Sequence, residues 1–134
     1  MSNVKEFRLL KRGNVEPLKQ KGPKKGPEAV IQEDLCDFLK LRGWFTIETH
    51  GNMYQHGLPD VLAMNRKYGS RWIEVKNPLS YAFTNAQLET FPLMVAHGVG
   101  VWVLTAATEH EYQKLFQPCN WWQYTQAFKV GSRT

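Results

Sequence analysis

The first clear pattern in the chain is a helical repeat of apolar residues that follows Pro27. At about 100° per residue, four side chains share one helix face: Ile31, Leu35, Phe38 and Leu39. Pro27 suits a first turn and Gly43 suits an end, so the pattern predicts a helix from residue 27 to about residue 42. Glu28 lies on the same face. A carboxylate in this position is stabilised in one of two ways: by a metal or lysine partner, or by the positive end of the helix dipole at the N-terminus.

Three strand patterns come next. Aromatic and β-branched residues predict strands at 44–49, 60–64 and 71–76, with a turn at 66–70 between the last two. Side chains alternate along a strand, so Glu74 and Lys76 are expected on one face of the third strand, opposite its apolar residues.

The second half of the chain predicts two further helices and one strand. Thr84 and Gln87 match a capping box, Pro92 should kink or shorten the helix that follows, and Gly98 should end it. The apolar run at 99–105 predicts a strand that is central and buried on both faces, followed by a short helix. The pattern therefore predicts an α/β domain over residues 28–134.

Charge separates the N-terminal residues from the rest. Residues 1–27 hold eight Lys and Arg against two Glu, while residues 28–134 carry a net charge of −1. The first 27 residues are thus predicted to be a basic, flexible tail, which either adds phosphate binding or serves as a solubilising leader. Neither a signal core nor an apolar run of membrane-spanning length is seen, and two cysteines suit a reducing, cytoplasmic setting.

Candidate chemistry lies on two neighbouring strands. Asp60 follows Pro59 at the start of one strand, and Glu74 and Lys76 lie on the next. Carboxylates are hard oxygen ligands that suit Mg²⁺, and an ammonium can orient water or offset charge on a phosphate in transfer. The alternative without a catalytic function is a surface salt bridge between Lys76 and either acid.

These residues carry a resemblance to a known family. The chain has Gly-Leu-Pro-Asp at 57–60, Glu-Val-Lys-Asn-Pro at 74–78, and Thr-x-x-Gln at 84–87 followed by Gly98. Over roughly residues 28–106 it resembles the PD-(D/E)xK nuclease superfamily, and within it the VRR-NUC domains, which are relatives of archaeal-type Holliday-junction resolvases. The resemblance implies a restriction-endonuclease-like α-β-β-β-α-β core, with a central mixed sheet flanked by helices.

The resemblance also implies roles for individual residues. Asp60, Glu74 and the Val75 carbonyl would bind Mg²⁺, for which Mn²⁺ can substitute, and Glu28 would bind a second metal or its water. Lys76 would position water or stabilise the transition state. A helix glutamine at Gln87 would contact active-site water or the DNA backbone, although the capping box explains that residue equally well.

Other residues are candidates for contact with DNA. They lie in the loop before Asp60 (His50, Asn52 and His56) and at the tip of the predicted hairpin (Arg66, Lys67 and Arg71). Exposed loop and turn residues without function are the alternative. Trp121 and Trp122 either stack on bases or, more in keeping with aromatic side chains, fill a core or an interface.

The leading hypothesis is a metal-dependent DNA endonuclease that is selective for branched DNA such as a Holliday junction, and the resemblance implies a homodimer. A restriction-type endonuclease that reads duplex sequence is the second hypothesis. The third is a nucleic-acid-binding protein that has the fold but no activity. A phage or bacterial origin would fit a small nuclease of this kind.

Overall fold

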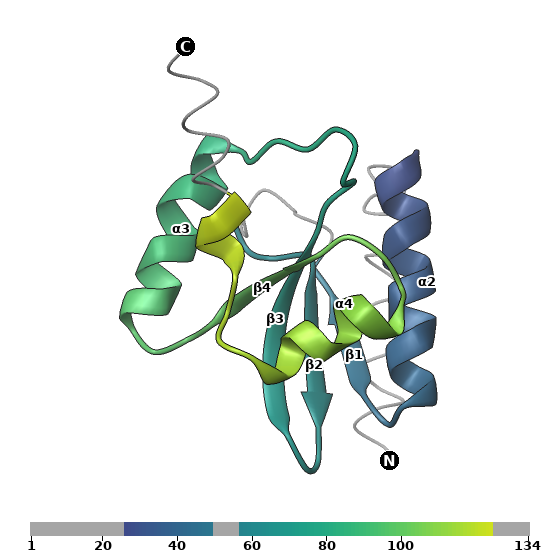
Figure 1. Ribbon diagram of the computed structural model, residues 1–134. Helices are drawn as coiled ribbons and strands as arrows, with labels where there is room; N and C mark the ends of the chain where they lie inside the picture. Colours follow the sequence, from purple (N-terminus) through teal and green to yellow (C-terminus); the bar gives the residue numbers. More distant parts are fainter. Residues whose placement is uncertain (1–25, 50–56, 125–134) are drawn as a thin grey trace, which may run out of the picture.

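The computed structural model describes residues 26–49 and 57–124, and it has a mixed α/β architecture with a four-stranded open sheet (Figure 1). Apart from its last two residues, the predicted basic tail lies outside the described residues, as do His50, Asn52 and His56. The elements are α2 (Pro27–Leu41), β1 (Phe45–Glu48), β2 (Val61–Asn65), β3 (Gly69–Val75), α3 (Asn85–Ala96), β4 (Val101–Leu104), α4 (Glu109–Gln113) and the 3-10 helix η1 (Lys114–Phe116).

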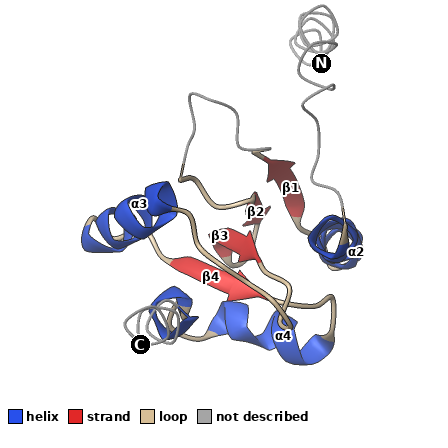
Figure 2. Cartoon of the chain, turned by 90° about the horizontal axis from the view of Figure 1, so that it is seen from above, coloured by secondary structure: helices blue, strands red, loops and turns tan. Residues whose placement is uncertain are grey.

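The sheet has the strand order β1-β2-β3-β4. Strand β2 runs antiparallel to both β1 and β3, whereas β3 and β4 are parallel and are joined through α3. Figure 2 shows α3 on one side of the sheet, and α2 and α4 on the other. The order of a helix, three strands, a helix and a strand is the predicted order, and each predicted strand lies within about two residues of the observed one.

Helix α2 buries the face that its sequence predicts. Leu35 and Leu39 are fully buried, and Ile31 and Phe38 pack against the same core from its margin. Burial raises the pKa of the Cys36 thiol to about 11, so this side chain is a neutral packing group at physiological pH. None of the helices among the described residues has the length and apolar character that crossing a membrane requires.

The β2–β3 turn is shorter than predicted, because β3 begins at Gly69 instead of after residue 70. The Asn65 side chain accepts hydrogen bonds from the backbone N–H groups of Lys67 and Tyr68, at 2.8 and 3.1 Å, and so closes the turn locally. Gly69 then supplies a positive φ of 86°.

Helix α3 begins as predicted and continues past its proline. Thr84 and Gln87 form the reciprocal capping box, and the helix runs to Ala96 with Pro92 inside it. Pro92 is exposed, so the ring and the missing hydrogen bond fall on the solvent side and do not end the helix. Gly98 follows the C-cap with a φ of 87°, in agreement with its predicted role.

Strand β4 was predicted to be central, and this prediction is wrong: among the described residues β4 is an edge strand that pairs only with β3. Its side chains are nevertheless buried on both sides of the sheet, with Val101 and Val103 in one apolar cluster and Leu104 in the other, and the Asn120 side chain pairs with its open edge. The Asn120 side-chain carbonyl oxygen accepts from the Val103 N–H at 2.7 Å, and its amide donates to the Val103 carbonyl at 3.1 Å. The side chain of one residue thus replaces one residue of a fifth strand.

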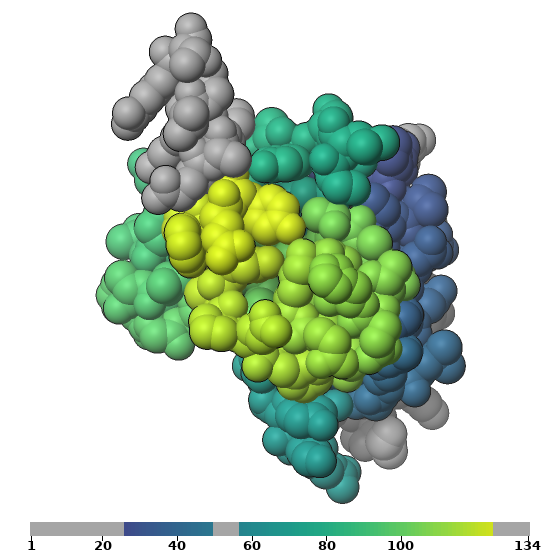
Figure 3. Space-filling view, viewed as in Figure 1, coloured from purple at the N-terminus to yellow at the C-terminus, as the bar shows by residue number. Residues whose placement is uncertain are grey.

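The two sides of the sheet bury separate apolar clusters. One cluster lies under α2, α4 and η1 and includes Val61, Ile73 and Val75, and the other lies under α3 and includes Val101 and Val103. Figure 3 shows α4 and the residues after it as a continuous cover over one side of the sheet. Trp121 belongs to the margin of the α3 cluster, as the core prediction required, whereas Trp122 is about half exposed.

Replacement of Asn120 by leucine should destabilise the fold by about 2–4 kcal/mol, because two backbone groups of β4 lose their partner in a buried position. Urea unfolding measures this change, with Gln123→Leu, at an exposed position nearby, as the control. Asn120→Asp keeps the acceptor but sets a carboxylate oxygen against the Val103 carbonyl, so it should also destabilise the fold relative to the control. Equal stability of the Asn120→Leu and control variants would contradict the edge-closing role.

Candidate active site

The segment before β2 is pressed against helix α3. Gly57 has a φ of 85°, and a Cβ atom there would lie 2.7 Å from the Ala86 carbonyl oxygen and 2.5 Å from the Thr90 hydroxyl. Only glycine satisfies both the backbone angle and the close approach. The predicted Gly-Leu-Pro-Asp motif therefore begins with a packing requirement, which fixes the position of Asp60 relative to α3.

Thr49 fixes the same segment from the other side. Its N–H donates to the Asp60 carbonyl at 2.9 Å, and its hydroxyl donates to the carbonyl of the buried Pro59 at 2.9 Å. Thr49 was included in the predicted first strand but not among the site residues. The signal that could have revealed it is register, because a residue that continues β1 by one position must meet the residue that precedes β2.

Asp60 and Glu74 are brought to opposite positions on adjacent strands. The β2–β3 register pairs Val61 with Ile73, and its continuation by one residue places Asp60 across from Glu74. At this point the Asp60 carboxylate, through Oδ2, accepts a hydrogen bond from the Val75 N–H at 2.8 Å. Two carboxylates from neighbouring strands thus converge at one end of the β2–β3 pair, as the sequence predicted.

Glu74 and Lys76 form a buried ion pair. The Lys76 Nζ lies 2.9 Å from Glu74 Oε2, and the two residues are 5% and 1% exposed. Because an unpaired charge in such a position would be strongly destabilising, each charge requires the other. The alternative of a surface salt bridge is excluded by this burial.

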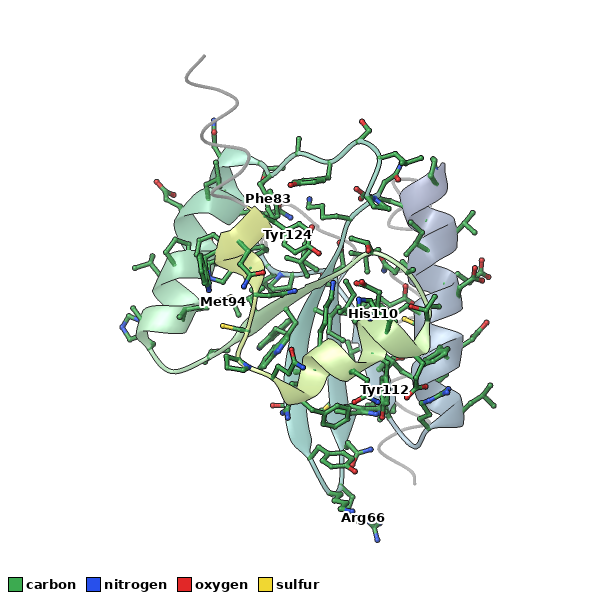
Figure 4. All side chains as sticks on the ribbon, viewed as in Figure 1. Arg66, Phe83, Met94, His110, Tyr112 and Tyr124 are labelled. Carbon is green, nitrogen blue, oxygen red and sulfur yellow. The ribbon has the colours of Figure 1, made fainter. Side chains whose placement is uncertain are left out.

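The loop between β3 and α3 completes the surroundings of Lys76. Its ammonium also donates to the Ala82 carbonyl at 2.8 Å and to Gln87 Oε1 at 3.4 Å, and it lies 4.5 Å from the centre of the Phe83 ring. Phe83 is labelled in Figure 4, at the start of α3. Lys76 therefore has an acceptor for each of its three protons, together with an aromatic face.

Gln87 forms the predicted capping box and also contacts Glu74. Its Oε1 accepts from the Thr84 N–H at 3.0 Å, which completes the capping box, and its Nε2 donates to Glu74 Oε2 at 2.8 Å. One amide thus connects the first turn of α3 to a carboxylate on β3. The capping motif itself signals only the first of these contacts.

The first turn of α2 reaches the same end of the sheet. Glu28 Oε2 accepts a hydrogen bond from the N–H of Asn77, just after β3, at 3.3 Å. One turn later Gln32 is buried and donates to Glu48, at the end of β1, at 2.8 Å. The helical spacing of Gln32 from Glu28 was a signal for this second contact that the sequence analysis did not use. The other three acids of α2, Glu33, Asp34 and Asp37, are exposed.

The basic hairpin tip lies away from these carboxylates. Six residues of extended chain separate Asp60 from Arg66, which corresponds to about 20 Å, and Figure 4 places Arg66 at the far tip of the hairpin. Arg66 and Lys67 are exposed there. Arg71 instead points to the protein, where it donates to the Leu115 carbonyl at 2.7 Å and lies over the Trp102 ring.

The donor set at this end of the sheet suits a hard divalent cation. Asp60 and Glu74 supply oxygen ligands from adjacent positions, which is the small number of protein carboxylates that Mg²⁺ uses beside water and phosphate. In the described ranges, no group of three His, Cys, Asp or Glu residues is arranged to hold a metal by itself. The residues therefore fit a cation that takes its other ligands from solvent, substrate or backbone.

Comparison of the chain with protein-family models, curated proteins and solved structures found no match. The function is accordingly inferred from the geometry of the described residues. That geometry joins Asp60, Glu74, Lys76, Gln87 and, through Asn77, Glu28 at one end of the sheet.

The variant Gly57→Ala should destabilise the protein by about 2 kcal/mol more than Gly98→Ala. Both positions have a positive φ, but a Cβ at Gly98 meets no atom within 4 Å, whereas a Cβ at Gly57 meets the backbone of α3. Thermal or urea unfolding of the two variants separates the close approach from the strain. Equal losses would contradict the requirement for close packing at Gly57.

The variant Lys76→Met should destabilise the fold by about 3–5 kcal/mol, because the Glu74 carboxylate keeps its charge and loses its buried counter-ion. Addition of Glu74→Gln should recover part of that loss, which a double-mutant cycle measures. Lys114→Met provides the matched control, since Lys114 pairs with Glu111 at 2.7 Å in a more exposed position. A loss at Lys76 no larger than that at Lys114 would contradict the mutual dependence of the buried charges.

Proposed function

We propose that the chain is a metal-dependent endonuclease that hydrolyses phosphodiester bonds in DNA. The observation that carries this proposal is the position of Asp60 across from Glu74, with the Lys76 ammonium against Glu74. Two carboxylates and one lysine at the ends of adjacent strands are the groups needed to bind a divalent cation and a phosphate. A buried pair of this kind is a poor source of stability, which favours a functional reason for its presence.

The arrangement of the elements supports the same proposal. A helix, three strands, a helix and a parallel fourth strand are the parts of the restriction-endonuclease-like core that the resemblance implies. The motifs at 57–60 and 74–78 occupy the ends of β2 and β3 at which such a core would carry its site. We therefore place the chain, as a proposal, with the PD-(D/E)xK nucleases of the VRR-NUC type.

The residues would divide the work as follows. Asp60, Glu74 and the Val75 carbonyl would bind Mg²⁺ or Mn²⁺, and Glu28 would hold further water or metal. The cation, when bound, would polarise the phosphate and lower the pKa of water. Lys76 would supply positive charge beside the phosphate, and the bond from Gln87 would keep Glu74 oriented. Hydrolysis would leave a 5′-phosphate and a 3′-hydroxyl.

Branched DNA is the proposed substrate, with a homodimer as the acting form, in keeping with the resemblance to junction-resolving enzymes.

One observation favours a second candidate function, a nucleic-acid-binding protein without cleavage activity. All three hydrogen bonds of the Lys76 ammonium go to protein acceptors, so the lysine must leave at least one of them to meet a phosphate.

Cleavage by the variant Asp60→Asn should fall at least about 100-fold, because removal of one carboxylate charge weakens cation binding and charge stabilisation. The assay compares a labelled four-way junction, a splayed arm, a 5′ flap, a linear duplex and a single strand, each with Mg²⁺, Mn²⁺ or EDTA. Asp34→Asn, on the exposed face of α2, should cleave like the wild type.

The same assay separates the two candidates. Metal-dependent cleavage by the wild type that Asp60→Asn lacks supports the nuclease, and paired cuts in the junction identify a resolvase. Tight binding by the wild type without cleavage of any of these substrates, under all metal conditions, would contradict the nuclease and favour the binding protein.

A further inference from the structure

Half of one sheet face is left uncovered by the described residues. Register and alternation place the side chains of Phe45, Ile47, Leu62, Met64, Trp72 and Glu74 on the same face as Val101 and Val103. Helix α3 covers the β4 side of this face, where Val101 and Val103 are buried. Over β1 and β2 no described helix covers it, as the position of α3 in Figure 2 indicates.

This uncovered half, which we call the open face (Phe45, Ile47, Leu62, Met64 and Trp72), is apolar. Phe45 is 64% exposed and Ile47 is 46% exposed, and the other three are partly exposed. Exposure of large apolar side chains to water is energetically unfavourable. Five of them lie side by side on three strands, which indicates a surface that binds a partner or ligand.

The two ends of the open face differ in their chemical character. At one end it continues into Glu74, which shares its face, and into Asp60 across the strand pair. At the other end it leads into a shallow, open hollow that is lined by Phe45, Met64, Ser70 and Arg66, among others. The open face therefore extends from the candidate active site to a shallow hollow whose margin carries positive charge, with Lys67 beside Arg66.

We propose that the open face binds the bases of a single-stranded nucleic acid arm, whose backbone is held at the hairpin tip by Arg66 and Lys67. This inference rests on the proposed function, because it takes the strand at the other end to be the one that reaches Asp60 and Glu74. It narrows the substrate class to DNA with an unpaired strand next to the cleaved bond.

Unpaired bases fit the open face better than a duplex does. Aromatic side chains bind single strands because each base has a face that stacks, and a basic groove follows the phosphates. A duplex instead presents phosphates on its outside and bases only at groove edges. Its binding would therefore place charged phosphates against the apolar side chains of Phe45 and Ile47. The length of about 20 Å from Asp60 to Arg66 accommodates on the order of four nucleotides, the lower end of the usual site size.

The charges support the same occupant. Phosphates attract the guanidinium of Arg66 in the hollow and the ammonium of the adjacent Lys67. The open face thus combines apolar side chains with positive charge at one end, which is the combination that binds single-stranded nucleic acid.

The test measures binding in EDTA, so that it does not depend on cleavage. Fluorescein-labelled oligo(dT) of 12 nucleotides and a 12-base-pair duplex are titrated with full-length protein and followed by anisotropy. We expect the wild type to bind oligo(dT) more tightly than the duplex, and Phe45→Ala to weaken oligo(dT) binding about tenfold while duplex binding stays unchanged. Arg66→Gln should weaken the binding of both and reduce the salt dependence by about one unit of slope.

Matched variants exclude a general effect of substitution. Trp122→Ala removes another half-exposed aromatic, from the segment that follows α4 and η1, and Lys40→Gln removes an exposed cation from α2. Both should bind oligo(dT) like the wild type. Circular dichroism of Phe45→Ala checks that loss of this exposed side chain leaves the fold intact.

Several results would overturn the proposal. These are unchanged oligo(dT) binding by Phe45→Ala, an equal loss for Trp122→Ala, and preference for the duplex. Light scattering that shows a dimer broken by Phe45→Ala, with no direct loss of oligo(dT) affinity per chain, would assign the open face to a second copy instead. The measured quantity is binding in the absence of metal. A chain that binds oligo(dT) but does not cleave DNA would therefore support this inference and contradict only the proposed nuclease activity.

Discussion

The arrangement of this protein depends on the burial of two opposite charges beside each other. Glu74 and Lys76 are almost completely removed from water, and their attraction offsets the loss of hydration only while each remains fully hydrogen-bonded. The Ala82 carbonyl and Gln87 Oε1 accept from Lys76, the Gln87 amide donates to Glu74 Oε2, and the Phe83 ring lies against the ammonium. The loop between β3 and α3 is consequently fixed by electrostatics as much as by packing.

The position of helix α3 depends on the same buried ion pair of Glu74 and Lys76. Gln87 caps the helix and binds Glu74 at once, so the start of α3 cannot shift along the sheet without loss of a buried hydrogen bond. Near Ala86 and Thr90 the helix packs against the backbone of Gly57 at a distance that excludes any side chain. The two strands that carry Asp60 and Glu74 are thereby held in one relation to the helix.

Local sequence signals predicted most of the elements and the convergence of the acidic residues. Apolar periodicity gave α2, the Thr84–Gln87 capping box gave the start of α3, and alternation placed Glu74 with Lys76, because each of these signals acts over a few residues. The burial of β4 was predicted but its central position was predicted wrongly, since the group that pairs with its edge is the side chain of Asn120, which is distant in sequence and ordinary in type. The distance of the hairpin tip from Asp60 likewise depends on register, and the residues of the loop at 50–56 lie outside the described part of the chain.

The two edges of the sheet differ in a way that limits how copies of this chain can join. An unpaired edge strand is a template for another strand, and growth into a fibre requires that each molecule offer two such edges. The Asn120 amide occupies the outward backbone groups of Val103 on the β4 edge. A strand from another molecule could pair along β4 only if it displaced this buried side chain, whereas no such bond is needed to keep β1 in the sheet. A single asparagine therefore disfavours polymerisation through the β4 edge.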